Sequence, residues 1–203
     1  MIKHIIFDFG GVLMDWNPRY LYRDYFRDDE KMEWFLANVC SPDWNVQMDA
    51  GKPFAEAVKE LQARWPEYSE AIAAFDSGWP KMLKGCFPDT VELLKDLKAR
   101  GYGIYGLTNW SAEKFPYAYE HYDFFSLFDG IVVSGAEKMV KPFPGLFRVL
   151  LDRYRLEPSE CLFIDDSQAN CDTARSLGIH AVHFESASQV RNYIQKNQSE
   201  FCN

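Results

Sequence analysis

The stretch His4-Ile5-Ile6-Phe7-Asp8-Phe9-Gly10-Gly11 decides the fold of this 203-residue chain. A short apolar run ends at an acid, and a pair of glycines follows closely. Runs of this kind, bounded by glycine, are typical of buried strands. We therefore predict a strand over residues 4–7 that ends at Asp8.

The same pattern recurs four times further along the chain, with helical patterns in between. The further strands are predicted over residues 103–108, 130–134, 161–165 and 180–184, and the helices over 88–101, 143–155 and 172–177. Alternating strands and helices predict an α/β fold, in which helices cover both faces of a doubly wound parallel sheet of the Rossmann-like kind.

Residues 16–85 interrupt this alternation, because only helical patterns are found there. These patterns cover residues 20–26, 31–39, 54–65 and 70–75. We interpret the segment as a helical cap subdomain inserted after the first strand. The predicted organisation is an α/β core of residues 1–15 and 86–203, with a cap of residues 16–85.

Composition limits the partners of the protein. Thirty acidic against 22 basic residues give a net charge of −8, which argues against binding to nucleic acid or to an anionic membrane. A small anionic substrate held by a local cation is compatible with this charge. We expect a monomer or homodimer.

The cysteines and the N-terminus indicate a cellular compartment. The five cysteines are odd in number and lack CxxC spacing, so we expect buried free thiols in a reducing cytoplasm. The N-terminus reaches an acid at Asp8 and lacks the long apolar stretch of a signal peptide. No run approaches the ~18 apolar residues of a membrane span, and we predict a cytoplasmic protein.

Polar side chains stand where the predicted strands end. In an open parallel sheet, ligands bind beyond the carboxyl ends of the strands. Asp8, Thr108 with Asn109, and Asp165 with Asp166 occupy these positions, and Lys141 follows the strand over residues 130–134. Carboxylates from two strands can form an oxygen-rich Mg²⁺ site, and a hydroxyl and an ammonium group can hold phosphate oxygens.

Four motifs in this order resemble the haloacid dehalogenase superfamily, whose members are mostly phosphatases. They are FDFGGVLMD at 7–15, GLTNWS at 106–111, KMVKPFPGLF at 138–147 and LFIDDSQAN at 162–170. The resemblance extends from residue 4 to about 184. The stretch 109–141 is similar to the branch that contains 2-haloacid dehalogenases and sugar-phosphate phosphatases, and residues 16–85 resemble the small helical cap of that family.

The resemblance implies a covalent mechanism for a small phosphorylated metabolite, including a sugar phosphate. Asp8 would attack phosphorus and form an aspartyl-phosphate. Thr108, Asn109 and Lys141 would bind the transferring oxygens, and the Lys141 cation would lower the pKa of Asp8.

The resemblance also implies a magnesium cofactor, since a carboxylate repels a phosphate dianion unless a cation neutralises the pair. The implied ligands are Asp8, the backbone carbonyl of Gly10 and Asp166, with Asp165 bound directly or through water.

One position departs from the family pattern. Most phosphatases of the family have an aspartate two residues after the nucleophile, which serves as general acid and base, and here that position is Gly10. Asp15 is the nearest candidate replacement. The alternative interpretation of Asp15 is a loop acid or a cap of the following helix.

Gly10 leaves two alternatives open. A metal-independent 2-haloacid dehalogenase needs no proton donor, but dehalogenases of the family look depleted of adjacent acids in the fourth motif, where this chain has Asp165 and Asp166. The neighbouring carboxylates favour Mg²⁺ and phosphoryl chemistry. A catalytically weak binding or regulatory module is the other alternative, and the intact Asp8 and Lys141 argue against it.

Substrate-facing residues are sought near the cap hinge and the second motif. The candidates are Asn17, Arg19, Tyr20, Trp44, Asn45, Gln47 and Trp110. Aromatic rings with amides and one arginine would suit a sugar, although aromatic residues of this kind also build cores.

Overall fold

A five-stranded parallel sheet forms the core of the computed structural model, which describes residues 1–201. The strand order is β5-β4-β1-β6-β7. Their bounds are β1 His4–Phe7, β4 Gly103–Thr108, β5 Gly130–Val133, β6 Cys161–Asp165 and β7 His180–His183. The predicted α/β fold is confirmed, and each predicted strand is found to within one residue.

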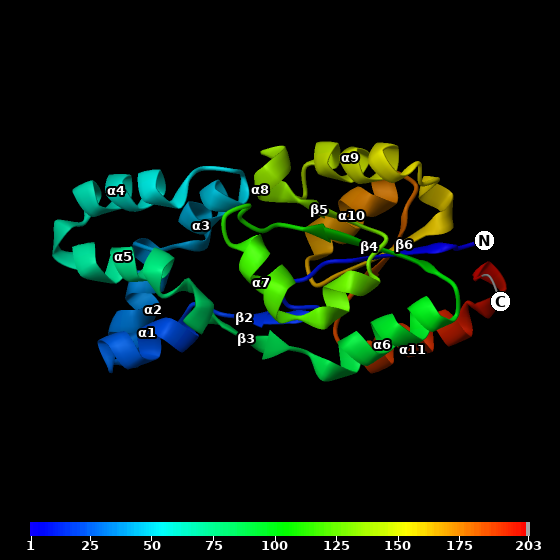
Figure 1. The fold of residues 1–203 in the computed structure, drawn as a ribbon, viewed down its shortest axis with the longest axis horizontal. Coiled ribbons are helices and arrows are strands. Elements are labelled where there is room, and N and C mark those ends of the chain that lie inside the picture. Colours follow the sequence, from blue (N-terminus) through cyan, green and yellow to red (C-terminus); the bar gives the residue numbers. More distant parts are fainter. Residues whose placement is uncertain (202–203) are drawn as a thin grey trace.

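Helices cover both faces of this sheet, as Figure 1 shows, with α6 and α11 on one side and α9 and α10 on the other. The helices of the core are α6 Pro88–Ala99, α7 Phe115–His121, α8 Ser134–Glu137, α9 Pro144–Tyr154, α10 Gln168–Ser176 and α11 Ala187–Lys196. Short 3₁₀ turns lie at Pro66–Tyr68, Trp79–Met82, Asp123–Leu127, Pro158–Glu160 and Gln198–Glu200.

The alternation of side chains along β1 explains the two layers. Ile5 and Phe7 belong to the apolar cluster that contains residues of α6 and α11, whereas Ile6 belongs to the cluster with residues of α9. All three are completely buried, because successive strand residues point to opposite faces and both faces are covered. This burial on both faces places β1 in the middle of the sheet.

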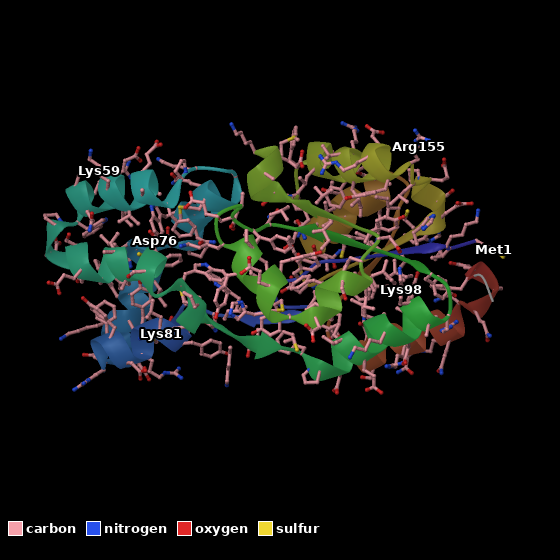
Figure 2. The ribbon with its side chains drawn as sticks, in the orientation of Figure 1. Met1, Lys59, Asp76, Lys81, Lys98 and Arg155 are labelled. Carbon is pink, nitrogen blue, oxygen red and sulfur yellow. The ribbon has the colours of Figure 1, made fainter. Side chains whose placement is uncertain are left out.

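Five helices form the cap beside the sheet, at the blue-to-cyan end of Figure 1. They are α1 Arg19–Phe26, α2 Asp29–Asn38, α3 Pro42–Asp49, α4 Phe54–Arg64 and α5 Ser69–Ser77. An ion pair between Asp76 of the cap, labelled in Figure 2, and Lys114 joins the cap to the loop that leads into α7.

Some helices differ from the sequence prediction. α3, α7, α8 and α11 were not predicted. The side chains of Ser41 and Ser186 cap the N-termini of α3 and α11. The helix predicted from Asp172 begins at Gln168 instead, because the motif containing Asp165 turns directly into it.

A two-stranded antiparallel sheet joins cap and core, so the prediction of helices alone over residues 16–85 is wrong. β2 (Met14–Trp16) pairs with β3 (Leu83–Cys86). Pairing satisfies the backbone groups of both connections. The predicted boundaries at 15/16 and 85/86 fall within these strands, and we propose to keep them as the division between core and cap.

The described cysteines form no disulfide, and the described helices are too short or too polar for a membrane span. Cys40, Cys86, Cys161 and Cys171 are free thiols, whereas Cys202 lies outside the described residues. Within residues 1–201, no helix has the length and apolar character needed to cross a membrane.

Candidate active site

Asp8 lies directly after the central strand β1, between the ends of β4 and β6. It is 8% exposed. Its Oδ1 accepts a hydrogen bond from the Phe9 backbone N–H at 2.7 Å and lies 2.9 Å from Lys141 Nζ. Both contacts fix the carboxylate in one orientation and leave Oδ2 without a hydrogen bond among the described residues.

Lys141 is the buried cation of the site. Its Nζ donates to Asp165 Oδ2 at 2.6 Å in addition to its contact with Asp8. Burial alone would lower the pKa of Lys141, but the charges of Asp8 and Asp165 raise it above its ordinary value. The ammonium group is therefore held charged between two carboxylates.

Asn109 holds Lys141 through the backbone. Its Nδ2 donates to the Lys141 carbonyl at 2.9 Å, and its Oδ1 accepts from the Lys141 N–H at 2.8 Å. Both polar ends of the side chain are thus occupied by Lys141. This geometry lets Asn109 position Lys141. Its Nδ2 has a second hydrogen to donate, and the predicted contact with phosphate oxygens stays a prediction.

Asp165 is fully buried and accepts several hydrogen bonds. Asn170 Nδ2 donates to both of its oxygens at 3.0 Å, and the Ser167 N–H donates to Oδ1 at 2.8 Å. Asn170 was not among the predicted site residues, although it is the last residue of the fourth motif. Asp165 therefore anchors Lys141 and the start of α10.

The carboxylates of Asp8, Asp165 and Asp166 converge at this edge of the sheet. One oxygen of each lies within 4.8 Å of the others. A set of carboxylate oxygens suits a hard divalent cation such as Mg²⁺. The residues present therefore fit the predicted metal.

Gly11 provides the space for Asp166. Its φ is +74°, and a Cβ at this position would lie 2.2 Å from Asp166 Oδ2. Both the backbone conformation and the close approach require glycine.

The single charge of Lys141 does not balance the three carboxylates of this cluster. Burial raises the pKa of Asp8 to about 7, because the lowering by Lys141 is smaller and Asp165 raises it further. Burial and Asp165 also raise the pKa of Asp166. Lys141 lowers the pKa of Asp8, as expected from the sequence, but in the protein without a metal ion burial raises this pKa by more. An additional positive charge would stabilise the ionised form of both carboxylates.

Thr108 ends β4 beside Asp8. It is completely buried, and its Oγ1 has no hydrogen-bond partner among the described residues. A buried hydroxyl without a partner costs about 1–3 kcal/mol. An oxygen of a bound phosphoryl group would satisfy it.

A pocket of about 430 Å³ opens beside Gly10, between core and cap. We call it the inner pocket. It is lined by Gly10, Trp16, Asn45, Asp49, Phe54, Trp79, Asn109, Trp110 and Ser111. The indole N–H groups of Trp16 and Trp110 find no acceptor among the described residues. Trp110 was predicted to face the substrate, and it lines this pocket.

A larger groove of about 1350 Å³ adjoins the inner pocket and shares Trp16, Asn45 and Asp49 with it. The predicted residues Asn17 and Arg19 line this outer groove. The Arg19 guanidinium is bound by Glu33, with Nη2 to Oε2 at 2.6 Å. Asn17 Oδ1 accepts from the Arg19 N–H at 3.0 Å.

Other predicted substrate contacts lie elsewhere. Trp44 is 7% exposed, packs against Phe75 at 5.0 Å between ring centroids, and lines neither cavity. It belongs to the cap core. Gln47 is exposed and also lines neither cavity.

Asp15, the predicted replacement for the missing acid, lies in β2. Its carboxylate accepts from the Tyr20 hydroxyl at 2.8 and 3.0 Å. Neither Asp15 nor Tyr20 lines the inner pocket or the outer groove. The structure gives Asp15 the role of joining β2 to α1, which is close to its alternative interpretation.

Asp49 is an acid of the inner pocket that sequence reasoning did not assign. It ends α3, and burial raises its pKa to about 7 against the effect of a hydrogen bond from the Ser111 backbone. The only signal in the sequence was its place at a turn before Gly51, which brings the end of a cap helix toward the core.

Comparisons with known proteins agree with this geometry. The sequence profile of haloacid dehalogenase-like hydrolases matches residues 2–178. A sesquiterpene phosphatase of Aspergillus oryzae is 31% identical over 89% of this chain and 89% of its own length. A probable pseudouridine-5'-phosphatase of Drosophila melanogaster is 25% identical over 89% of this chain and 80% of its own.

A solved structure shows the same fold. A haloacid dehalogenase family enzyme from Bacteroides thetaiotaomicron, crystallised as a magnesium complex, superposes with a TM-score of 0.73 at 22% identity, over 94% of this chain and 98% of that one. With its motifs placed at one edge of a parallel sheet and matched over residues 2–178, the chain belongs to the haloacid dehalogenase-like hydrolases.

Proposed function

We propose that this protein is a Mg²⁺-dependent phosphatase of small organic phosphate monoesters that acts through an aspartyl-phosphate on Asp8. The observation that carries this proposal is the convergence of Asp8, Lys141, Asp165 and Asp166 at one sheet edge, beside the unpartnered hydroxyl of Thr108. The phosphatases among its relatives support it.

The described residues supply the parts of a phosphoryl transfer. Asp8 presents Oδ2 for attack on phosphorus while Phe9 and Lys141 hold Oδ1. Lys141 and Thr108 would bind the phosphoryl oxygens, since both have donors at this edge. Positioning and charge stabilisation provide most of the catalysis in such reactions.

Asp8, Asp166 and the Gly10 carbonyl would hold the magnesium ion, with Asp165 beside it. When bound, the ion neutralises the charge between carboxylate and phosphate. The oxygen-only donor set and the raised pKa values of Asp8 and Asp166 support its binding.

The substrate carries an uncharged organic group in this proposal. The inner pocket contains no cationic side chain among its lining residues, and Arg19 in the outer groove is neutralised by Glu33. Four aromatic residues line the inner pocket, namely Trp16, Phe54, Trp79 and Trp110. Sugar phosphates, as expected from the sequence, and terpenoid phosphates, as in one relative, both belong to this class. A cytoplasmic monomer or homodimer remains part of the proposal.

A magnesium titration with a panel of phosphate monoesters tests the function. We expect hydrolysis of at least one sugar or prenyl phosphate with Mg²⁺, and its loss in EDTA and in Asp8→Asn. Asp172→Asn, which changes an acid on the exposed surface of α10, is the matched control and should keep full activity. Hydrolysis that persists in EDTA or in Asp8→Asn would refute the metal-dependent covalent mechanism.

A 2-haloacid dehalogenase is the second candidate, because Gly10 removes an acid that halide displacement does not need. The cluster of Asp165 and Asp166 near Asp8 disfavours it, since the single charge of Lys141 leaves the three carboxylates with an excess of negative charge that a metal ion would neutralise. Chloride release from 2-chloropropionate in the presence of EDTA would favour this candidate over the phosphatase.

A further inference from the structure

The site described above lacks a proton donor for the leaving group. An alcohol leaves phosphorus poorly as an alkoxide, and a general acid typically contributes about 10²- to 10⁴-fold. Gly10 stands where most family phosphatases have this acid. A Cβ built on Gly10 meets nothing within 4 Å, and Gly10 lines the inner pocket. The place of the missing side chain is therefore open space inside that pocket.

Asp49 is the one ionisable side chain among the nine residues that line the inner pocket. It comes from the cap, at the end of α3, whereas Gly10, Asn109, Trp110 and Ser111 belong to the core. The pocket thus combines an acid from the cap with the loops that follow β1 and β4.

The core fixes the position of Asp49. Asn45 Nδ2 donates to Asp49 Oδ2 at 3.1 Å. Ser134 Oγ donates to the Asp49 carbonyl at 2.6 Å. Two residues later, a Cβ on Gly51 would lie 2.9 Å from the Gly135 carbonyl, so the turn packs directly against the core. Asp49 is held by contacts within helix α3 and by contacts across to the core.

We propose that Asp49 is the general acid and base of this phosphatase and replaces the aspartate that is absent at Gly10. This inference rests on the proposed phosphatase function. It assigns the role to a residue of the cap, so that the acid reaches the reaction when the cap is docked on the core.

The proton and electron pairs balance over two steps. In the first, Asp8 Oδ2 forms a bond to phosphorus, the bond from phosphorus to the ester oxygen breaks, and that oxygen keeps the electron pair and takes the proton of the Asp49 carboxyl group. In the second, the Asp49 carboxylate takes a proton from water, the water oxygen bonds to phosphorus, and the bond to Asp8 breaks. Phosphate leaves, Asp8 is again a carboxylate, and Asp49 is again protonated.

The electrostatic environment of Asp49 agrees with this role. Burial raises its pKa to about 7, so both protonation states are accessible near neutral pH. Of the other charged residues lining the adjoining groove, Arg19 and Glu33 are paired with each other. Asp15, the alternative proton donor, accepts a hydrogen bond from the Tyr20 hydroxyl instead.

Leaving groups of graded acidity test the proposal. Asparagine has nearly the same shape as aspartate but cannot donate this proton. In Asp49→Asn, the rate of hydrolysis of an alkyl phosphate should fall by about 10²- to 10⁴-fold. The rate with p-nitrophenyl phosphate should fall less than about tenfold, because nitrophenolate leaves without a proton. Asp43→Asn, which changes an exposed acid of the same helix, is the matched control. An equal loss for both substrates would overturn the proposal and indicate a role in docking the cap.

A second variant keeps the test valid if Asp49→Asn loosens the cap. Gly10→Asp places a carboxyl group in the open space of the pocket, and the double variant with Asp49→Asn should recover the alkyl phosphatase activity. Failure to recover, or a leaving-group-dependent loss in Asp15→Asn instead, would contradict the role of Asp49. Absence of any phosphatase activity in the unmodified protein would refute the proposed function itself and is distinguishable from these outcomes.

Discussion

Replacing Lys141 by methionine removes the cation that holds two buried carboxylates together. Lys141 Nζ lies 2.9 Å from Asp8 Oδ1 and 2.6 Å from Asp165 Oδ2, and the Lys141 side chain is 1% exposed. At an effective dielectric constant of about 20, each contact contributes roughly 6 kcal/mol of Coulomb attraction. Desolvation of the charges offsets most of this.

The net cost of the substitution is smaller than the attraction and is still large. Removing one partner of a buried ion pair typically costs about 3–5 kcal/mol. Asp8 can take up a proton when the cation is gone, which limits the cost, so we expect a loss of about 3 kcal/mol in the free energy of unfolding. The Asp8→Asn/Lys141→Met double variant should recover part of it, because one of the two uncompensated charges is removed.

Urea denaturation of the metal-free protein measures this loss. Lys98→Met is the matched control, since Lys98 also lies 2.6 Å from a carboxylate, that of Asp129, but its side chain is 32% exposed. Surface pairs of this kind are worth about 0–1 kcal/mol. If Lys141→Met destabilises the protein no more than Lys98→Met, the electrostatic account of the site is wrong.

Three further substitutions separate backbone, packing and binding effects. Gly11→Ala should lower the free energy of unfolding by about 1–2 kcal/mol, because the backbone is left-handed there, and should raise the Mg²⁺ concentration needed for activity, because the new Cβ meets Asp166. Gly101→Ala is the control, since its φ is +87° and a Cβ there meets nothing within 4 Å. In the same urea and Mg²⁺ titrations it should show the backbone effect alone. Trp44→Ala should destabilise the protein by about 3–5 kcal/mol in thermal or urea unfolding, and a stability change below about 1 kcal/mol would contradict its place in the cap core. Thr108→Val should leave stability unchanged or raise it by up to about 1 kcal/mol while lowering kcat/KM at least tenfold; a variant that keeps full activity would remove Thr108 from the site.

The arrangement of the core could be predicted from the sequence because its signals are local. The apolar runs at 4–7, 103–108 and 161–165 coincide with β1, β4 and β6, since strands buried on both faces consist of continuous apolar residues. The acids and the hydroxyl at their ends then meet at one edge, because parallel strands place their carboxyl ends together.

Hydrogen-bond partners could not be predicted in the same way. The binding of the Lys141 backbone by Asn109 joins residues 32 positions apart. The pairing of Arg19 with Glu33 and of Asp15 with Tyr20 depends on how α1 packs on its neighbours. A motif specifies which groups are present at a site, whereas packing decides which of these groups form hydrogen bonds or ion pairs with one another.

By itself, the sequence determined the five strands of the parallel sheet, the helical nature of most of the cap, and the set of groups that gather around Asp8. Only the tertiary structure decided how the cap meets the core, through the antiparallel pair of β2 and β3 and the turn after α3 that packs on Gly135. The physical reason is that strand burial and strand ends follow from neighbouring residues, whereas the hydrogen bond from Ser134 to the Asp49 carbonyl forms between segments that only folding brings together. The sequence shows that an acid is absent at Gly10, and the folded cap brings Asp49, which we propose as its replacement, to the same pocket.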